Sequence, residues 1–264
     1  MPEGPETQRQ VDFLLSLFKF GLEEYVLGDL EIFGDRFEVD KDLLLKSIGE
    51  SLKAIYCKGK TYFIELGGGL TVVAHHGMDG WWSVKKEKHS QAMFTFLRVV
   101  AGQPVEDDAV IFYYTNVRLG NFEVHEHRAA MLLRDELASG FIGKFVLEQA
   151  EFVINFSEFS DRKRLRDTLF DQHKICSGLG NYLIAEIMYD MKLHPLATLG
   201  DLDTQTRMEL YHVCKKHVQG HYDSSLKMSV YDCQQDPFGN PVKKLKVGGR
   251  VAHWVPTIQT RGEH

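Results

Sequence analysis

The first residues of the chain combine a secondary amine with two carboxylates. Pro2 follows the initiator Met1, and Glu3 and Glu6 come shortly after it. Because proline is small, we expect Met1 to be removed, which would leave the Pro2 amine at the start of the chain. The reference pKa of a terminal amine is about 7.7–8.0, against about 10.4 for lysine, so more of it is neutral at physiological pH. A neutral amine can attack C1′ of a sugar and form an iminium, with a nearby carboxylate as acid or base.

Such an amine needs an element that holds it in place. Apolar side chains at Val11, Leu14 and Phe18 recur at helical spacing, which predicts a helix over residues 5–19. Pro5 suits the first helical turn. The positive end of the helix dipole disfavours the charged form of a nearby amine and so lowers its pKa. The alternative explanation is that the first residues form a solvated tail, as most termini do.

The rest of the chain changes its pattern twice. Residues 26–128 consist of short β-prone runs separated by Gly, Asp and Asn, which is typical of an antiparallel sandwich or barrel. Helical spacing follows, and the last stretch is typical of a β-hairpin. The sequence therefore predicts an α+β fold: an N-terminal helix and antiparallel β-sandwich over 1–128, a helical domain over 129–228 and a hairpin over 229–264. We expect helices at residues 129–140, 145–150, 161–171, 179–191 and 203–218.

Composition limits the classes of protein. Hydrophobic residues make up 44% and charged residues 26% of the 264 residues, as in ordinary globular proteins. No apolar run approaches the roughly 20 residues of a membrane-spanning helix, and the first residues lack a signal-peptide pattern. We therefore expect a soluble, intracellular monomer with no membrane partner, whose compartment stays open.

The cysteines imply no metal and no cofactor. They are scattered, form no CxxC pair and match no zinc-site spacing. We expect structural thiols at all four positions, which are Cys57, Cys176, Cys214 and Cys233.

A net charge of −6 counts against a nucleic-acid partner, but binding depends on the local potential more than on the total charge. A short run of basic residues is more often a solvated face than a binding surface. Three such runs that face the same groove would instead indicate a nucleic-acid-binding surface. They comprise Lys85, Lys86 and Lys88; Arg162, Lys163, Arg164 and Arg166; and Lys243, Lys244, Lys246 and Arg250.

Six segments carry distinctive residue patterns: MPEGPE at 1–6, KGKTY at 58–62, HHGMDG at 75–80, TNVRLG at 115–120, LFDQHKICSGLGNYLIAEIMY at 169–189 and GRVAHWVPTIQ at 249–259. In this order they resemble the formamidopyrimidine-DNA glycosylase/endonuclease VIII family, and they span nearly the whole chain. Each segment alone has an ordinary structural explanation, such as a surface lysine, a core methionine or turn glycines. So many coincidences in one order are improbable.

The resemblance implies a bifunctional DNA glycosylase and abasic-site lyase of base excision repair, whose partner is damaged DNA, double- or single-stranded. Pro2 would form a Schiff base with the sugar, and β or β,δ elimination would follow. Glu3 would act as general acid or base and Glu6 as a lesser active-site carboxylate. Lys60 would orient a phosphate next to the lesion.

The resemblance also implies residues that hold the DNA. Met78, Arg118 and Leu119 would fill the space left by the flipped nucleotide, with Leu119 in place of the family's aromatic wedge. The implied phosphate-binding residues are Asn181 of a helix–two-turn–helix motif and Arg250 of a finger hairpin. We expect Arg166, from one of the basic runs, to bind a phosphate as well.

Two departures from the family pattern lead to further predictions. Zinc-bearing members close the finger with Y-C-P-x-C-Q, whereas Val255 and Ile258 stand at the two cysteine positions here. We therefore expect a zincless finger held by packing of these two residues and Trp254. Members that recognise 8-oxoguanine have a long loop before the finger, whereas this chain runs from Gly220 to the expected strand near residue 229 in few residues. A short loop would favour oxidised pyrimidines and ring-opened purines as substrates.

Two alternatives to this function stay open. An abasic-site lyase with little base excision would use the same Pro2 and Glu3. A non-catalytic damaged-DNA-binding module would keep the fold but has no need of a free terminal proline. Pro2, Glu3 and Lys60 together therefore count against the second alternative. The preference for single or double strands and the type of elimination also stay open.

Overall fold

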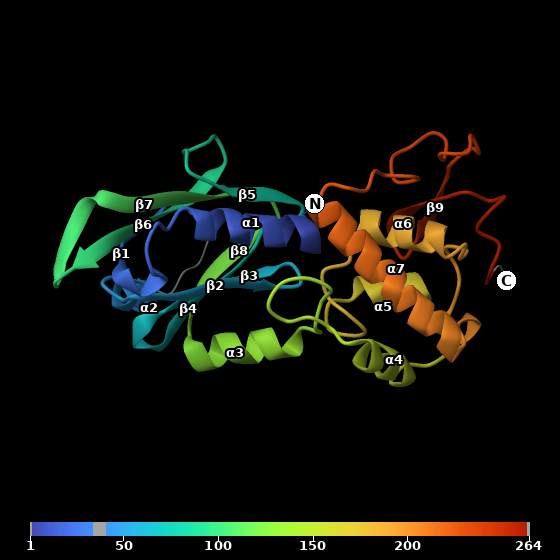
Figure 1. Ribbon diagram of the computed structural model, residues 1–264, viewed down its shortest axis with the longest axis horizontal. Helices are drawn as coiled ribbons and strands as arrows, with labels where there is room; N and C mark the ends of the chain where they lie inside the picture. Colours follow the sequence, from blue (N-terminus) through green and yellow to red (C-terminus); the bar gives the residue numbers. More distant parts are fainter. Residues whose placement is uncertain (1, 34–40, 263–264) are drawn as a thin grey trace. The chain divides into compact units, whose positions relative to one another are not determined.

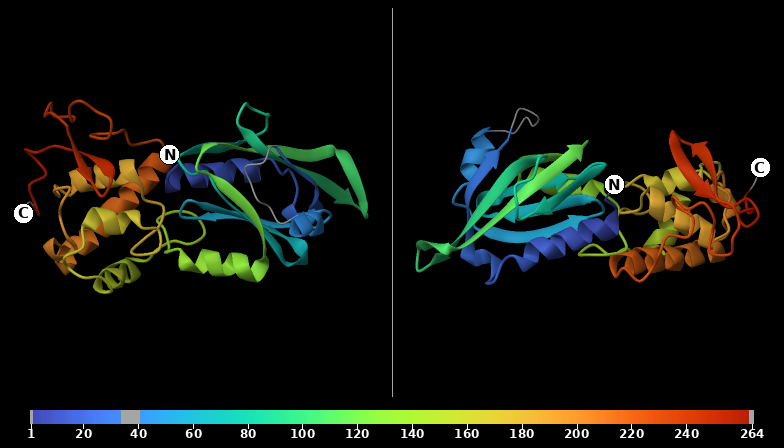
Figure 2. Two further views of the ribbon diagram at one scale, coloured as in Figure 1. Left: turned by 180° about the vertical axis from the view of Figure 1, so that it is seen from behind. Right: turned by 90° about the horizontal axis from the view of Figure 1, so that it is seen from above.

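The computed structural model of the protein describes residues 2–33 and 41–262. The chain divides into two compact units, and Figures 1 and 2 show the elements of each from three sides. Within the described residues, the first unit consists of Pro2 and residues 6–136. The second unit consists of Glu3–Pro5 and residues 137–262.

The first unit contains two four-stranded antiparallel sheets, with strand orders β1-β6-β7-β5 and β2-β3-β4-β8. Its elements are α1 (Gly4–Ser16), η1 (Leu22–Glu24), β1 (Tyr25–Ile32), α2 (Lys41–Ser47), β2 (Leu52–Lys58), β3 (Thr61–Leu66), η2 (Gly67–Gly69), β4 (Leu70–His75), β5 (Asp79–Ser83), β6 (Ser90–Val100), β7 (Gln103–Arg118), β8 (Asn121–Glu126) and α3 (His127–Glu136).

Side chains from both sheets and from α1 meet in one hydrophobic core. Strand β6 alternates buried and half-buried residues along most of its length, because one of its faces lies in that core. Phe94 and Phe112 stack with ring centroids 5.3 Å apart, and Trp82 meets both rings edge-on. The other sheet contributes Tyr62 and Phe122. The sandwich with an N-terminal helix is therefore the architecture of this unit.

Helix α3 packs along β4 and β8 and buries Ala130. The first unit consequently extends to Glu136, whereas we expected a break after residue 128. Helical spacing alone gave no sign that this helix covers a sheet.

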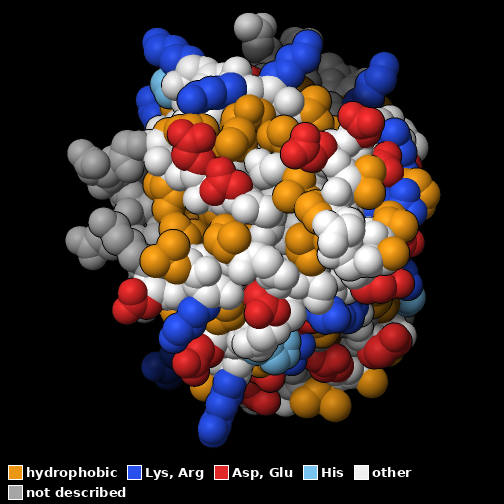
Figure 3. Space-filling view, turned by 90° about the vertical axis from the view of Figure 1, so that its left-hand side faces the viewer, with side chains coloured by type: hydrophobic (Ala, Val, Ile, Leu, Met, Phe, Trp, Pro, Cys, Tyr) orange, Lys and Arg blue, Asp and Glu red, His pale blue; other side chains and the backbone are white. Residues whose placement is uncertain are grey.

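One end of the first unit, which carries α2 and the tips of β6 and β7, has a mixed surface. Basic side chains lie mainly at the rim of this face, and acidic and hydrophobic side chains lie between them (Figure 3). Among its described residues are the exposed Leu45 and Val100. This face therefore lacks the concentrated positive charge that a polyanion requires, as far as its described residues show.

The second unit is built around α6, whose residues Tyr182–Tyr189 are all buried. Helices α5 and α7 pack against it. None of the described helices is long and apolar enough to span a membrane. The elements are α4 (Gln149–Ser157), α5 (Leu165–Phe170), α6 (Asn181–Asp190), η3 (Leu199–Asp201), α7 (Thr204–Tyr222), β9 (Lys243–Val247) and β10 (Arg250–Trp254).

One expected helix in this unit is wrong. Residues 145–148 are not helical, because Gly140 bridges to Val146 and exchanges backbone hydrogen bonds with Phe145 and Leu147. Helix α4 begins only at Gln149.

The finger hairpin consists of β9 and β10, with Gly248 and Gly249 in its turn. The expectation that it begins near residue 229 is wrong, because residues 223–242 contain neither helix nor strand and connect α7 to β9. The connection before the hairpin is therefore long, and the expected short loop is wrong as well. Val255 is fully buried and packs with Ile258 and Tyr189, whereas Trp254, which we expected to join them, lies edge-on to His194.

Glu186, a buried residue of α6, holds this connection in place. Its carboxylate accepts hydrogen bonds from the backbone N–H groups of Ser229 at 2.7 Å, Val230 at 2.9 Å and Tyr231 at 2.8 Å. A buried N–H without a partner costs about 1–3 kcal/mol. These three bonds therefore fix the segment against α6 without a strand.

Replacing Glu186 with Gln should lower the free energy of unfolding by about 2 kcal/mol, because a charged acceptor is lost and an NH₂ group turns toward backbone N–H groups. Urea unfolding followed by circular dichroism measures this change. Glu209→Gln, at an exposed position of α7, is the matched control. Equal stability of the two variants would contradict the role given to Glu186.

Candidate functional site

A pocket of about 210 Å³ in the first unit brings the amine and Lys60 together. Lys60 lies in the turn between β2 and β3, and His75 and His76 come from the end of β4. The volume lies below the roughly 300–1,000 Å³ of common ligand pockets, so the site suits one small group. The lining residues are Pro2, Thr7, Lys60, Thr61, Tyr62, His75, His76 and Gly77.

His76 forms an aromatic wall of this pocket. Its ring stacks on Tyr114 with centroids 5.0 Å apart and meets Tyr62 and Trp82 edge-on. Burial, together with the neighbouring His75, lowers the pKa of His76 to about 3. His76 is therefore neutral at physiological pH.

Two neighbouring loops of the first unit expose large side chains. Met78, between β4 and β5, is 46% exposed, and Leu119, between β7 and β8, is 68% exposed. The backbone N–H of Met78 donates to the carbonyl of Arg118 at 3.1 Å, so the two loops touch. Arg118 is exposed beside them. The structure thus brings together the three residues that the resemblance assigns to one task.

Both loops are tightly constrained. Leu119 has a φ of +57°, which costs a non-glycine residue free energy. Gly77 has a φ of +58°, and a Cβ there would lie 2.2 Å from the carbonyl oxygen of Leu119. Gly77 is therefore required for the close approach of the loops.

Glu3 belongs to the second unit and is only 1% exposed. Its Oε1 accepts from the backbone N–H of Tyr182 at 3.0 Å and its Oε2 from that of Leu183 at 3.3 Å. These are first-turn amides of α6, where the helix dipole also favours a negative charge. A Cβ on Gly180 would lie 2.3 Å from the Glu3 carboxyl group, so a side chain at that position would displace the carboxylate.

Glu6 is placed differently. It is half-exposed, forms an ion pair with Arg9 at 2.9 Å and is not among the residues that line the pocket. The expected lesser role of Glu6 finds no direct geometric support in the described residues.

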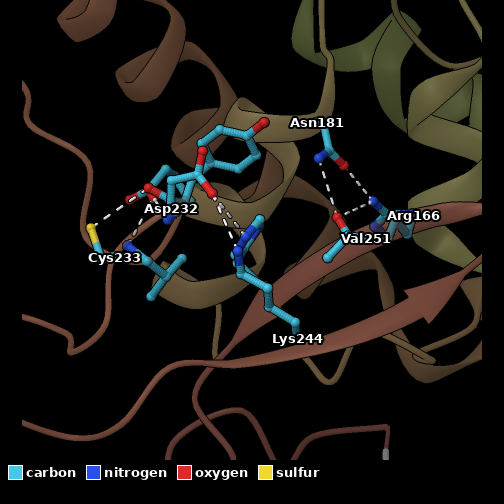
Figure 4. A network of polar contacts seen from close by, with 10 residues as sticks. Arg166, Asn181, Asp232, Cys233, Lys244 and Val251 are labelled. Atoms are coloured by element: carbon cyan, nitrogen blue, oxygen red, sulfur yellow. Dashed lines mark hydrogen bonds and ion pairs between the residues drawn. The ribbon is translucent and has the colours of Figure 1, made fainter.

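Arg166 and Asn181 join α5, α6 and the hairpin (Figure 4). Nη2 of Arg166 donates to Oδ1 of Asn181 at 2.5 Å, and Nη1 donates to the carbonyl of Val247 at 3.2 Å. Nδ2 of Asn181 donates to the carbonyl of Val251 at 3.2 Å. Arg166 is 2% exposed, and burial lowers its pKa. Such burial favours a supporting contact with Asn181 over the direct phosphate contact that we expected of Arg166.

Arg250 lies on the surface of the same unit. It is exposed at the start of β10, and its guanidinium carbon lies 3.8 Å from the centre of the Phe170 ring. A cation above an aromatic face is held in place without losing its access to solvent. Arg250 can therefore present its charge to an anion.

Sequence reasoning missed Asn116, which is fully buried in β7 between the two loops. It stands inside the TNVRLG segment and interrupts a β-prone run. Asparagine is depleted in strands, and this was the signal that could have identified it.

The described residues contain no group of three or more His, Cys, Asp or Glu side chains suited to hold a metal ion. Cys57, Cys176, Cys214 and Cys233 are free thiols, and the first three are buried.

In sequence and fold the chain is similar to DNA-repair glycosylases. The family model of the formamidopyrimidine-DNA glycosylase N-terminal domain matches residues 1–119. Formamidopyrimidine-DNA glycosylase of Lactobacillus helveticus (strain DPC 4571) is 25% identical over 294 residues, covering 98% of this chain and 99% of that protein. Endonuclease 8 of Klebsiella pneumoniae (strain 342) is 24% identical over 282 residues, covering 98% and 100%.

A structure of the Lactococcus lactis formamidopyrimidine-DNA glycosylase with DNA that contains an oxidised pyrimidine has the same fold, with a TM-score of 0.76 and 20% identity. The match covers 98% of this chain and 100% of the Lactococcus lactis chain. These similarities agree with the resemblance of the six segments to the formamidopyrimidine-DNA glycosylase/endonuclease VIII family.

The buried His76 leads to a prediction about acid stability. The pKa of His76 is lower in the folded protein than in the unfolded protein, where it has its ordinary value of 6.5. As the pH falls, the unfolded state therefore takes up the proton first. Wild type should therefore lose stability as the pH falls from 6.5 toward 3. We expect His76→Phe to lose about 2 kcal/mol less than wild type between pH 7 and pH 5. Urea unfolding at both pH values measures the difference.

His89→Gln is the control for this measurement, because His89 is exposed. An equal loss of stability in wild type and His76→Phe would mean that His76 is not buried as a neutral group.

Proposed function

We propose that this protein is a bifunctional DNA glycosylase and abasic-site lyase of base excision repair that removes oxidised bases from damaged DNA. The observation that carries the proposal is the pocket in which Pro2 and Lys60 meet, although they are far apart in the sequence. An amine that attacks a sugar works next to a phosphate, and Lys60 supplies the cation for it. Because DNA is the substrate, an intracellular location is part of the proposal.

The reaction begins at the nitrogen of Pro2, which requires that the mature chain starts there. The nitrogen attacks C1′, the bond from C1′ to the base breaks, and the base leaves with the electron pair and takes up a proton. The sugar ring opens and an iminium links Pro2 to C1′. Loss of a proton from C2′ then expels the 3′ phosphate, and water hydrolyses the iminium to release Pro2.

Glu3 is the proposed acid or base for ring opening and proton transfer. Its carboxylate is held by two amides of α6, so the group has a fixed position within its unit. A positioned acid or base typically contributes about 10²–10⁴-fold to a rate. Glu6 keeps a lesser role in the proposal because it is already paired with Arg9.

Asn181 and Arg250 are the proposed phosphate ligands of the second unit. The amide of Asn181 stands at the first residue of α6, where backbone N–H groups favour an anion. Arg250 is exposed above Phe170. We assign Arg166 the task of holding Asn181, because its guanidinium is buried against that side chain and the hairpin carbonyls.

Met78, Arg118 and Leu119 are the proposed residues that occupy the space of the flipped nucleotide. Extruding a base costs a few kcal/mol, and side chains that replace its stacking contacts offset part of this. The exposed apolar pair of Met78 and Leu119 suits that task.

This proposal does not favour one class of oxidised base over another. We expected oxidised pyrimidines and ring-opened purines to be favoured because of a short connection before the hairpin, but residues 223–242 form a long one. The connection is no longer a reason to prefer pyrimidines over 8-oxoguanine.

Borohydride trapping on an oligonucleotide that contains thymine glycol tests the reaction class. Wild type should give a covalent adduct, because reduction fixes the iminium. Peptide mapping should place this adduct on a peptide that begins with Pro2, and the intact mass should show that Met1 is absent. A second oligonucleotide with 8-oxoguanine measures the preference between lesions.

Pro2→Ala serves as the comparison in the same assay. An adduct on a lysine would sink the assignment of Pro2. Adducts on an abasic oligonucleotide without release of thymine glycol or 8-oxoguanine would favour the alternative of an abasic-site lyase. No adduct on any substrate at low salt, where phosphate contacts persist, would favour the binding module.

The substitution Leu119→Gly should separate the effect of the strained backbone on stability from the effect of the Leu119 side chain on base release. Glycine relieves the positive φ but also gains freedom in the unfolded chain, so the free energy of unfolding should change by less than about 0.5 kcal/mol. Base release from duplex DNA should nevertheless fall about ten-fold, because the apolar contact of the wedge is lost. Single-turnover kinetics and urea unfolding measure the two effects.

The matched control is Ser224→Gly, which changes an exposed residue with the same φ of +57° in the second unit. If Leu119→Gly releases the base from duplex DNA as fast as this control, Leu119 is no wedge.

A further inference from the structure

Asn116 lies between the two loops that carry the proposed wedge residues. Its Nδ2 donates to the carbonyl of His76 at 2.6 Å and to that of Asp79 at 3.2 Å. Its Oδ1 accepts from the backbone N–H of Gly120 at 3.0 Å. The first two partners flank Met78, and the third follows Leu119. One side chain therefore holds both loops.

Asn116 itself is fixed from the other side. Its backbone N–H donates to the carbonyl of His89 at 3.1 Å, and its carbonyl accepts from Nε2 of Gln91 at 2.8 Å. The side chain is fully buried in the strand β7. A buried, anchored amide has no alternative solvent contacts, so its bonds to the loops persist.

An amide is the group that this place requires. It offers two N–H donors to two carbonyl oxygens and one oxygen to an N–H group. A carboxylate of the same shape would keep the acceptor but would direct a charged oxygen at two carbonyl oxygens. The substitution of Asn116 by Asp therefore breaks the connection to the Met78 loop while leaving the volume almost unchanged.

The loops need such a connection. Leu119 combines a positive φ with high exposure, and Gly77 permits a very close approach to its carbonyl. Strained residues persist only where their surroundings hold them. The same His76 whose carbonyl binds Asn116 also lines the pocket of Pro2. The His76 ring in the pocket wall has its own support, because it packs on Tyr62, Trp82 and Tyr114.

We propose that Asn116 is a positioning residue that locks the Met78 loop and the Arg118–Leu119 loop into one rigid insertion element for duplex DNA. The inference rests on the proposed function and deepens it. Asn116 touches no reacting atom in this role. It is needed where a base has to leave a stacked duplex, and it is not needed where an abasic sugar in a single strand reaches Pro2 without extrusion.

The experiment compares wild type, Asn116→Asp and the control Asn121→Ser, which removes a nearby amide that donates to Glu123. Single-turnover release of an oxidised base from a duplex is one readout. Borohydride trapping on a single-stranded abasic oligonucleotide is the other. Asn116→Asp should lose at least about ten-fold in the first, because a wedge displaced by one ångström misaligns the extruded nucleotide. Its trapping of the abasic strand should stay within about two-fold of wild type, because this step needs no wedge.

Combining Asn116→Asp with Leu119→Gly tests whether the two residues act together. Since both changes disable the same element, their effects on duplex excision should not multiply. Multiplying effects, or equal losses on both substrates, would overturn the proposal and leave Asn116 a residue of general stability. Unchanged duplex excision would overturn it as well. If wild type traps no abasic strand, the proposed function itself fails and this inference fails with it.

Discussion

Backbone groups that leave a helix or strand inside a protein need hydrogen-bond partners, because an unsatisfied buried group costs about 1–3 kcal/mol. In this protein, buried side chains supply those partners next to residues that have a role in the proposed function. Asn116 serves the two exposed loops of the first unit. In the second unit Glu3 binds the first amides of α6, and Glu186 binds the segment before the hairpin. Asn116 and Glu186 thus fix loop backbone, and Glu3 satisfies first-turn amides of α6 that have no partner within the helix.

This arrangement separates the groups that hold from the groups that act. Glu186 and Asn116 are buried, and both the shape and the polarity of their side chains are needed for their hydrogen bonds to the backbone. Met78 and Leu119 are exposed on the loops that Asn116 holds, and Arg250 is exposed above Phe170. Exposed apolar side chains and a positive φ at Leu119 weaken the fold locally, and such departures are expected where a surface serves a partner. A rigid support beneath the exposed side chains makes these departures tolerable, because the side chains then have little conformational freedom to lose on binding.

Much of this could be predicted from the sequence. The periodicity of residues 26–128 predicted the sandwich, and the six segments predicted the similarity to DNA glycosylases. The segments also contain Pro2, Lys60 and most of the other residues that line the pocket. The errors share a cause. Residues 223–242 were expected to be short and to include a strand, but Glu186 orders part of them through contacts distant in sequence. Arg166 stands in a basic run and was expected to bind a phosphate, because a run of charges says nothing about which member α5 turns inward. Local patterns predict elements, whereas the order of loops depends on tertiary partners.

The hairpin illustrates how the same fold element can be held in different ways. A structural metal contributes its binding energy to folding, so a finger without thiolates at the positions of Val255 and Ile258 must be stabilised otherwise. Val255 and Ile258 pack with Tyr189 and Val230. Gln259 accepts from the N–H of Val255 at 2.8 Å and donates to the carbonyl of Leu193 at 2.9 Å. Arg166 then binds the carbonyl of Val247 within the hairpin itself. These contacts tie the hairpin to α6 and thereby to Asn181, so the residues that keep the finger folded also set the position of the proposed phosphate ligand.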